Sequence, residues 1–418
     1  MFLVDDKLVF PWVASRLIAV SLVSFLATTF TSSAIGQSPT PTPDRKKTFG
    51  HSLKRFESEL NLGSSTARAI ASDDIIRIET NMVVADVLVV NPKGNAIVGL
   101  SKDDFVITEN GVRQETDLFS GGPERSIPCS IVLIIEVGTI PSMADKSLEA
   151  ARRLVDKLGP HDRMAIVNTN TQLILDFTSD KKLLKKTLEA LKAESWAGRH
   201  NYSSLIASLL ELFSPQDVRP IVINQSYGDE LGLLKPLSEA NKRYCQKGVR
   251  GMCERKYSFA QLRDIVERSR ATIYSVVPGP QFVGRSKDQQ IKQALMYLTG
   301  YWDEIRLADH PLQRAKETSA RDTYRKTWTE NEIFAHVESQ KSLIDISGTS
   351  GGVTQFLETP GDAEDIYDSI YKMIENRYTI GFYPKNETND GKRRTIKIEV
   401  KGHPEYLILG RKTFFNPR

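Results

Sequence analysis

Oxygen-bearing side chains follow one strongly apolar stretch, and their chemistry is that of a ligand or cation site. The stretch runs from Ile131 to Ile135, and Glu136 comes directly after it. Gly138, Thr139 and Ser142 then supply a flexible backbone position and two hydroxyl groups. Carboxylate and hydroxyl oxygens are the ligands that hard cations such as Mg²⁺ and Ca²⁺ prefer. Residues 136–142 are therefore the first candidate binding site.

A strand, a loop and a helix must position these groups. Five consecutive apolar residues, four of them β-branched, are typical of a strand buried on both faces of a parallel sheet. An amphipathic helix is predicted over 144–158. In open α/β sheets, ligands bind outside the carboxyl ends of the strands. The other polar residues expected to face this crevice are Asn201, Ser203, Asn224 and Gln225.

The middle of the chain, residues 126–376, alternates between strands and helices. The predicted strands are 131–136, 164–169, 172–176, 219–224 and 271–277. The predicted helices are 144–158, 180–193, 202–213, 257–270, 332–347 and 361–376. Such alternation predicts an α/β fold with a doubly wound, mostly parallel sheet covered by helices on both faces. Residues 279–331 are too long for a plain loop, so a helical insertion is expected there, either as packing filler or as a partner surface.

The two ends of the chain are rich in short strands. Residues 75–90 end at the turn Asn91 to Gly94, and the Asn110-Gly111 pair predicts a hairpin between 105–109 and 114–119. The C-terminal part repeats this style, with strands predicted at 378–383, 395–401 and 406–409. Neither end has enough strands to close a sheet alone. We expect 75–125 and 377–418 to form one β-sandwich into which the α/β domain is inserted.

The stretch SIVLIIEVGTIPSM, residues 130–143, resembles the first strand and metal loop of a von Willebrand factor A (vWA) domain. Two flanking motifs resemble those of a bacterial vWA-related family typical of acidobacterial secreted proteins: GLSKDDF at 99–105 and YTIGFYP at 378–384. The run Asp176-Phe177-Thr178-Ser179-Asp180 is also similar to that family. The resemblance implies a Rossmann-like vWA domain that acts by binding other molecules.

The resemblance implies a divalent cation site. In vWA domains an Asp-x-Ser-x-Ser loop, a Thr and a later Asp hold this cation. Here Glu136 stands for the first Asp, Gly138 and Ile140 for the two serines, and the 198–203 loop for the threonine loop. Asn224 or Gln225 stands for the later Asp. These departures predict a degenerate site without metal. If a Mg²⁺ or Ca²⁺ ion were bound, the expected ligands would be Glu136, Ser142, Ser203 and Asp229.

Function classes can be ranked from the same residues. A non-catalytic module that binds a protein or a cell-surface ligand is the first interpretation, and a metal-dependent adhesion module is the alternative. An enzyme is the second alternative, without sequence support: GxSxG, HExxH, P-loop and GxGxxG motifs are absent. The six histidines are not at ligand spacing; they are His51, His161, His200, His310, His336 and His403.

Composition and targeting signals bound the setting. The 418 residues include 56 basic and 52 acidic side chains without long blocks of one sign, which gives no support for nucleic-acid binding. Residues 17–30 are apolar and are followed by small residues, so 1–36 is predicted to be a signal peptide and the mature protein to be secreted or periplasmic, with no membrane span. The Pro-rich start of 37–74 predicts a linker.

Three cysteines remain after the predicted signal peptide. An oxidising compartment is compatible with a bridge between Cys245 and Cys253, and three unpaired thiols are nearly as compatible with the sequence. Cys129 precedes the buried strand and is predicted to be a buried free thiol. The spacing of these cysteines does not indicate a metal site.

Overall fold

The computed structural model describes residues 2–4, 7–9, 43–54, 82–121, 127–137, 141–191, 200–214, 216, 217, 219–228, 257–306, 333–386, 388 and 390–415. Its largest element is a sheet of eight described strands, in the order β1-β2-β12-β11-β10-β7-β8-β9. The six main strands are β7 (Cys129–Ile135), β8 (Arg163–Asn168), β9 (Gln172–Thr178), β10 (Arg219–Gln225), β11 (Thr272–Pro278) and β12 (Thr354–Leu357). All neighbouring pairs among these six are parallel except β8 and β9. The predicted mixed α/β fold with a central sheet is therefore confirmed.

The order of the six main strands fixes where a ligand site belongs. Numbered from β7 along the chain, they are arranged 3-2-1-4-5-6, which is the order of doubly wound dinucleotide-binding sheets. β7 lies between β8 on one side and β10 on the other, so the strand order reverses between β7 and β10. The carboxyl ends of β7 and β10 form the topological switch point, where ligands bind in such sheets.

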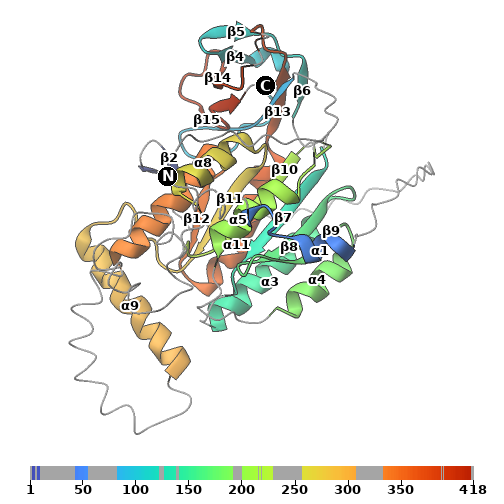
Figure 1. Cartoon of the computed structure of the whole chain (residues 1–418). Coiled ribbons are helices and arrows are strands. Elements are labelled where there is room, and N and C mark those ends of the chain that lie inside the picture. Colours follow the sequence, from blue (N-terminus) through green and yellow to red (C-terminus); the bar gives the residue numbers. More distant parts are fainter. Residues whose placement is uncertain are drawn as a thin grey trace, which may run out of the picture.

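Helices cover both faces of this sheet (Figure 1). One face carries α3 (Pro141–Lys157), α4 (Lys181–Glu189) and α11 (Ala363–Glu375). The other carries α5 (Asn201–Glu211), α8 (Phe259–Arg268) and a helix over 333–350. Alternate side chains of β7 enter the two cores, with Leu133 in the first and Val132 in the second. This two-sided burial explains the uninterrupted apolar run of β7.

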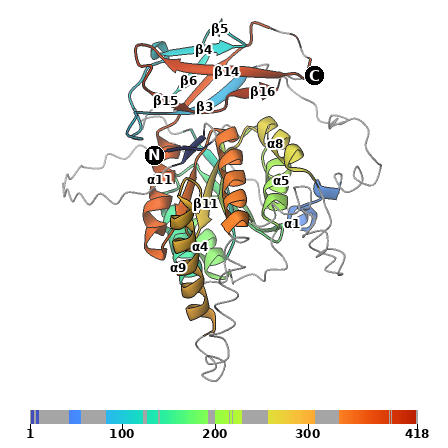
Figure 2. The same cartoon turned by 90° about the vertical axis from the view of Figure 1, so that its left-hand side faces the viewer.

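Strands from the two ends of the chain pair with each other above the central sheet (Figure 2). One four-stranded sheet has the order β15-β3-β13-β6, and a second has the order β16-β14-β4-β5. The N-terminal strands are β3 (Val83–Val90), β4 (Phe105–Glu109), β5 (Val112–Gln114) and β6 (Leu118–Ser120). The C-terminal strands are β13 (Tyr378–Phe382), β14 (Arg393–Val400), β15 (Leu407–Leu409) and β16 (Thr413–Phe415). Both sheets contribute to one apolar core.

Buried arginines join these two sheets to the α/β part. Arg377 is 2% exposed, and its guanidinium donates to the carbonyl oxygens of Asp86, Gly351 and Leu409 at 2.8, 2.9 and 3.0 Å. It also donates to the Tyr274 hydroxyl of β11 at 3.1 Å. The four partners come from four separate segments of the chain. One side chain therefore holds the two parts together through charge-assisted hydrogen bonds.

Two further arginines reinforce the same junction. Arg219 of β10 forms an ion pair with Asp86 of β3 at 3.2 Å; burial opposes its charge, but Asp86 keeps the pKa of Arg219 above its ordinary value. Arg411 donates to the carbonyls of Val266 and Glu267 in the last turn of α8 at 3.3 and 3.1 Å. Burial, together with neighbouring guanidinium groups, lowers the pKa of Arg411 to about 10.

Several predicted boundaries change in the structure. The Asn110-Gly111 turn is correct, with φ angles of 47° and 84°, but a single strand over 114–119 is wrong. The segment divides into β5, which pairs with β4, and β6, which moves to the other sheet and pairs with β13. β12 was not predicted, because its four residues are too short for a clear pattern. The expected insertion does contain a helix, α9 (Lys287–Arg306), while 307–331 lies outside the described residues.

The N-terminal predictions have mixed outcomes. The linker prediction over 37–74 is wrong for residues 43–54, where α1 (Pro43–Thr48) and the turn after it pack on the α/β part. The signal peptide stays a prediction, because only β1 (Phe2–Val4) and β2 (Lys7–Val9) are described within 1–36. Among the helices of the described residues, none combines the length and the apolar character needed to cross a bilayer.

Candidate functional site

The predicted crevice residues Glu136 and Gln225 meet at the switch point. Gln225 is the last residue of β10 and pairs with Ile135, the last residue of β7. The Glu136 N–H donates to the Gln225 carbonyl at 3.0 Å, and the Gln225 side-chain amide donates back to the Glu136 carbonyl at 3.1 Å. Parallel pairing therefore places both side chains at one edge of the sheet, as the sequence predicted.

The Glu136 carboxylate is turned into the protein. The residue is 1% exposed, and its Oε2 accepts hydrogen bonds from the Ser226 hydroxyl at 2.7 Å and from the Tyr227 N–H at 3.1 Å. The Ser226 oxygen in turn accepts from the Gly228 N–H at 3.1 Å. Residues 226–228 thus wrap around the carboxylate. This oxygen is occupied by donors of the chain itself rather than directed toward an open site.

Tyr367 is a site residue that sequence reasoning missed. It lies on α11, is buried, and its hydroxyl donates to the Oε1 of Gln225. Burial raises the pKa of Tyr367 above its ordinary value, so the phenol stays a donor at physiological pH. The contact orients the Gln225 amide so that its NH₂ group meets Glu136. In the sequence, Tyr367 occupies one apolar position of an amphipathic helix, and no local pattern predicts that its hydroxyl forms a hydrogen bond with Gln225.

The first turn of α5 brings Asn201 and Ser203 to the same edge. The helix begins at Asn201, and His200 at the N-cap makes no side-chain capping bond. The Ser203 hydroxyl lies 2.9 Å from the Tyr257 hydroxyl, and the Ser204 hydroxyl donates to the Asn168 carbonyl at the end of β8 at 2.9 Å. All residues from 201 to 209 are buried. The helix is therefore fixed against the carboxyl ends of the strands.

Two buried amides at this edge have no described partner. Asn224 of β10 is 0% exposed and Asn201 is 1% exposed, and neither the oxygen nor the nitrogen of either amide has a hydrogen-bond partner among the described residues. Asn224 lies on the same face of β10 as Val222, whose side chain packs in the core beneath α5. Buried polar groups are nearly always paired, so such exceptions call for an explanation.

Five predicted residues lie outside the described part of the chain. Gly138, Thr139, Asp229, Cys245 and Cys253 lie outside the described residues, and so does the predicted 245–253 bridge. Ser142 lies in the first turn of α3, but its side chain is not described. Cys129, in contrast, is a buried free thiol as predicted, and burial raises its pKa from 9.0 to about 12.

The described residues at this edge do not by themselves fit the divalent cation site that a vWA resemblance implies. Glu136 already accepts two hydrogen bonds on one oxygen, and the Ser203 hydroxyl lies against a phenol. Mg²⁺ and Ca²⁺ require several converging oxygen ligands, usually with more than one carboxylate. Within the described part of the chain, no three His, Cys, Asp or Glu side chains are grouped so as to hold a metal ion.

An aromatic hollow lies next to the candidate site at the ends of β10 and β11. It is lined by Tyr227, Val277, Pro278, Pro280, Phe282, His336 and Gln340. Phe282 and His336 stack with ring centroids 5.4 Å apart, and the Gln340 oxygen accepts from the N–H groups of Phe282 and Val283 at 2.9 and 3.1 Å. The Gln340 amide is thus satisfied, since its nitrogen also donates to the Pro280 carbonyl at 2.8 Å. Tyr227 belongs to the predicted crevice, whereas the lining residues from the end of β11 onward were not predicted to belong to the site.

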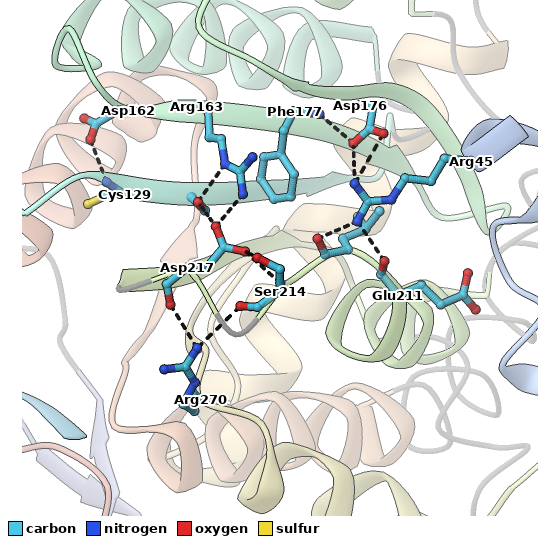
Figure 3. A network of polar contacts seen from close by, with 12 residues as sticks. Arg45, Cys129, Asp162, Arg163, Asp176, Phe177, Glu211, Ser214, Asp217 and Arg270 are labelled. Carbon is cyan, nitrogen blue, oxygen red and sulfur yellow. Dashed lines mark hydrogen bonds and ion pairs between the residues drawn. The ribbon is translucent and has the colours of Figure 1, made fainter. Parts of the chain in front are cut away.

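At the amino ends of the strands, opposite the candidate site, Asp217 is a buried polar residue with a structural role (Figure 3). Asp217 is 4% exposed and accepts from the Ser214 N–H at 2.7 Å, from Arg163 at 2.5 Å and from the Ser130 hydroxyl. Burial alone would raise the pKa of Asp217, but these hydrogen bonds hold it below 3.8. Both carboxylate oxygens of Asp217 are therefore paired, in contrast to the amide atoms of Asn201 and Asn224.

Comparisons with known proteins give weak likenesses only. Neither protein-family models nor curated protein sequences match this chain. Among solved structures it is similar to proximal thread matrix protein 1 from the mussel byssus, at 9% identity and a TM-score of 0.32, over 59% of this chain and 48% of that one. The chain thus spans about half the length of the mussel protein. Another structure of that protein has zinc in its MIDAS motif.

Two bacterial structures are similar at the same level. The vWF domain of the type V pili tip protein Mfa5 from Porphyromonas gingivalis has 12% identity and a TM-score of 0.34, over 60% of this chain and 96% of that one. BatB from Bacteroides thetaiotaomicron has 14% identity and a TM-score of 0.29, over 59% and 98%. Scores this low assign neither a family nor a function. The doubly wound character of the central sheet follows from its own strand order.

Proposed function

We propose that the protein is a non-catalytic binding module of vWA-like fold that holds a protein or cell-surface ligand at the carboxyl edge of its central sheet without a bound metal ion. In this proposal it is exported and acts in the periplasm or outside the cell. The two smaller sheets form a β-sandwich into which the α/β domain is inserted, as the pairing of strands from both chain ends supports.

The observation that carries the proposal is a pair of buried amides, Asn201 and Asn224, that have no hydrogen-bond partner among the described residues. An unpaired buried amide lowers the free energy of unfolding by about 1–3 kcal/mol. At the amino ends of the strands the buried carboxylate of Asp217 is fully paired, so unpaired buried groups at the carboxyl ends call for a functional explanation. Strain and unmet polarity concentrate at functional sites. Ligand hydrogen bonds to these amides would recover the cost when the partner binds.

Metal independence is supported by the state of Glu136. One carboxylate oxygen, Oε2, is engaged by Ser226 and Tyr227, so a cation at that oxygen would have to displace these donors before it could bind. The metal-dependent alternative needs Glu136, Ser142, Ser203 and Asp229 to converge. Catalysis is not proposed, because the described partner of the Ser203 hydroxyl is the Tyr257 phenol, which is a poor general base.

Capture of partners from the envelope of the native host tests the proposal. Mature protein would be immobilised in the presence of a chelator, as wild type and as Asn224→Leu, with Asn95→Leu at an exposed turn as the matched control. Wild type and control should retain the same partner, and Asn224→Leu should lose it while remaining folded. Capture that disappears with the chelator would favour the metal-dependent alternative. Capture that is unaffected by Asn224→Leu would contradict the proposed site.

A further inference from the structure

Residues 43–54, here called the strap, lie against β9 at the edge of the central sheet (Figure 1). They comprise α1 and the turn that follows it. A helix of six residues does not persist alone in water, because nucleation costs more than so few hydrogen bonds return. The strap must therefore be held by tertiary contacts, and these contacts define what it covers.

Arg45 ties the first half of the strap to two elements (Figure 3). Its guanidinium forms an ion pair with Asp176 of β9 at 3.3 Å. It also donates to the carbonyl oxygens of Glu211 and Leu212 at 2.8 and 2.6 Å, at the C-terminus of α5. The last carbonyls of a helix lack intrahelical donors and attract positive charge. Arg45 therefore caps α5 and binds β9 at the same time.

Glu211 holds the second half of the strap. Its two carboxylate oxygens accept the N–H groups of Gly50 and Ser52, each at 2.8 Å. Gly50 has a φ of 91°, a conformation that lets the chain turn so that both N–H groups reach one carboxylate. Leu53, 6% exposed, then enters the core beneath α5. The strap is thus built into the α/β domain at three points.

β9, the strand that the strap covers, has the features of a strand that pairs with another chain when its edge is exposed. Among the described strands, β9 has a neighbour on one side only, β8, and its sequence QLILDFT contains four large apolar residues and one charge. The strap's Lys46 donates to the carbonyl oxygen of Ile174 at 2.5 Å, so this carbonyl points outward from the sheet. Exposed edge strands with apolar sequence and free carbonyls are templates for strand addition.

We propose that β9 is a self-association surface whose partner is β9 of a second copy of this chain, and that the strap keeps it closed. When the strap is displaced, two β9 strands pair in antiparallel fashion about a two-fold axis and join two sheets. Such pairing is self-complementary, since each copy offers the same outward-facing groups to the other. The surface is separate from the carboxyl-edge site and does not depend on it.

Loosening the strap tests the proposal. The double variant Arg45→Ala and Glu211→Ala removes the ion pair and both carboxylate contacts. The control variant Lys47→Ala and Glu189→Ala removes the same two charges at exposed positions. Sedimentation velocity over a range of concentrations should show dimers of the double variant where wild type and control are monomers. The same association state for all three proteins would overturn the proposal.

A rescue variant separates edge pairing from association through exposed core residues. Ile174→Lys, added to the double variant, places a like charge on both edges and should restore the monomer. Dimers that persist with Ile174→Lys would overturn the proposal. If the double variant does not fold, Arg45→Ala alone carries the test, because it keeps Glu211 and Leu53 in place. Amide exchange of β9 in dilute Arg45→Ala should then rise at least about tenfold and fall again at high concentration; unchanged exchange would refute the strap's role.

Discussion

Replacing Asn224 by leucine should make the protein more stable. The two side chains have the same number of heavy atoms, branched at the same carbon, and Asn224 is fully buried with both amide atoms unpartnered among the described residues. The leucine would pack against the apolar neighbours of that face, such as Val222. An unsatisfied buried amide costs about 1–3 kcal/mol, so Asn224→Leu should raise the free energy of unfolding by roughly that amount.

Asn168 provides a matched control at the same edge of the sheet. It ends β8, is 7% exposed, and its amide is satisfied: its nitrogen donates to the Gln172 side chain at 3.0 Å. Its oxygen accepts the N–H groups of Asn170 and Gln172 at 3.2 and 3.1 Å. Asn168→Leu should therefore lower the free energy of unfolding by about 1–3 kcal/mol. The same chemical change is expected to have opposite signs at two neighbouring strand ends.

Urea denaturation followed by far-UV circular dichroism at neutral pH measures both changes by linear extrapolation. An unchanged dependence on urea would show that the variants unfold from comparable native states. If Asn224→Leu destabilised the protein as much as Asn168→Leu, the Asn224 amide would have a structural partner. The reasoning that assigns it to a ligand would then be wrong.

Three further changes test other parts of the structure by the same denaturation assay. Arg377→Met should lower the free energy of unfolding by about 3–5 kcal/mol, whereas Arg393→Met should cost less than about 1 kcal/mol. The Arg393 side chain is 54% exposed, and its partner across the same junction, Glu267, keeps a second ion pair with Arg263. Equal losses would contradict the role of Arg377. Asp217→Asn should lower the free energy of unfolding by about 2–3 kcal/mol at neutral pH. Because the fold holds the pKa of Asp217 below 3.8, the difference in free energy of unfolding between variant and wild type should narrow as the pH falls below that value. A constant difference would refute this. Since burial raises the pKa of Cys129 from 9.0 to about 12, the thiol of the unfolded chain ionises first, and the free energy of unfolding falls as the pH rises above 9. Between pH 8 and pH 10.5, Cys129→Ala should therefore lose roughly 2 kcal/mol less of its free energy of unfolding than wild type. Equal losses would argue against the buried thiol.

Local patterns were sufficient to predict the frame of the candidate site. The apolar run at 131–135 required burial on both faces, which placed β7 in the middle of the sheet and Glu136 at its carboxyl end. The Asn110-Gly111 pair fixed the hairpin turn, because both residues adopt positive φ. These predictions succeeded because the cause lies within a few residues of the chain.

Features that depend on distant parts of the chain could not be predicted. The contact of Tyr367 with Gln225 joins residues 142 positions apart, and neither side chain signals the other. The strap folds because Glu211 supplies two acceptors for it, while its own Pro-rich start resembles a linker. That no described residue pairs with the amides of Asn201 and Asn224 is a property of packing and cannot be seen in the sequence.

Titration of the purified mature protein with Mg²⁺, Mn²⁺ and Ca²⁺ in a calorimeter tests the central claim most directly. The account predicts no saturable heat at millimolar cation for wild type or for Glu136→Ala. One oxygen of the Glu136 carboxylate is held by Ser226 and Tyr227, and the described residues form no group of three His, Cys, Asp or Glu side chains that could hold a metal ion. A saturable heat in wild type that disappears in Glu136→Ala would contradict the claim. The carboxyl edge would then be a metal-dependent adhesion site.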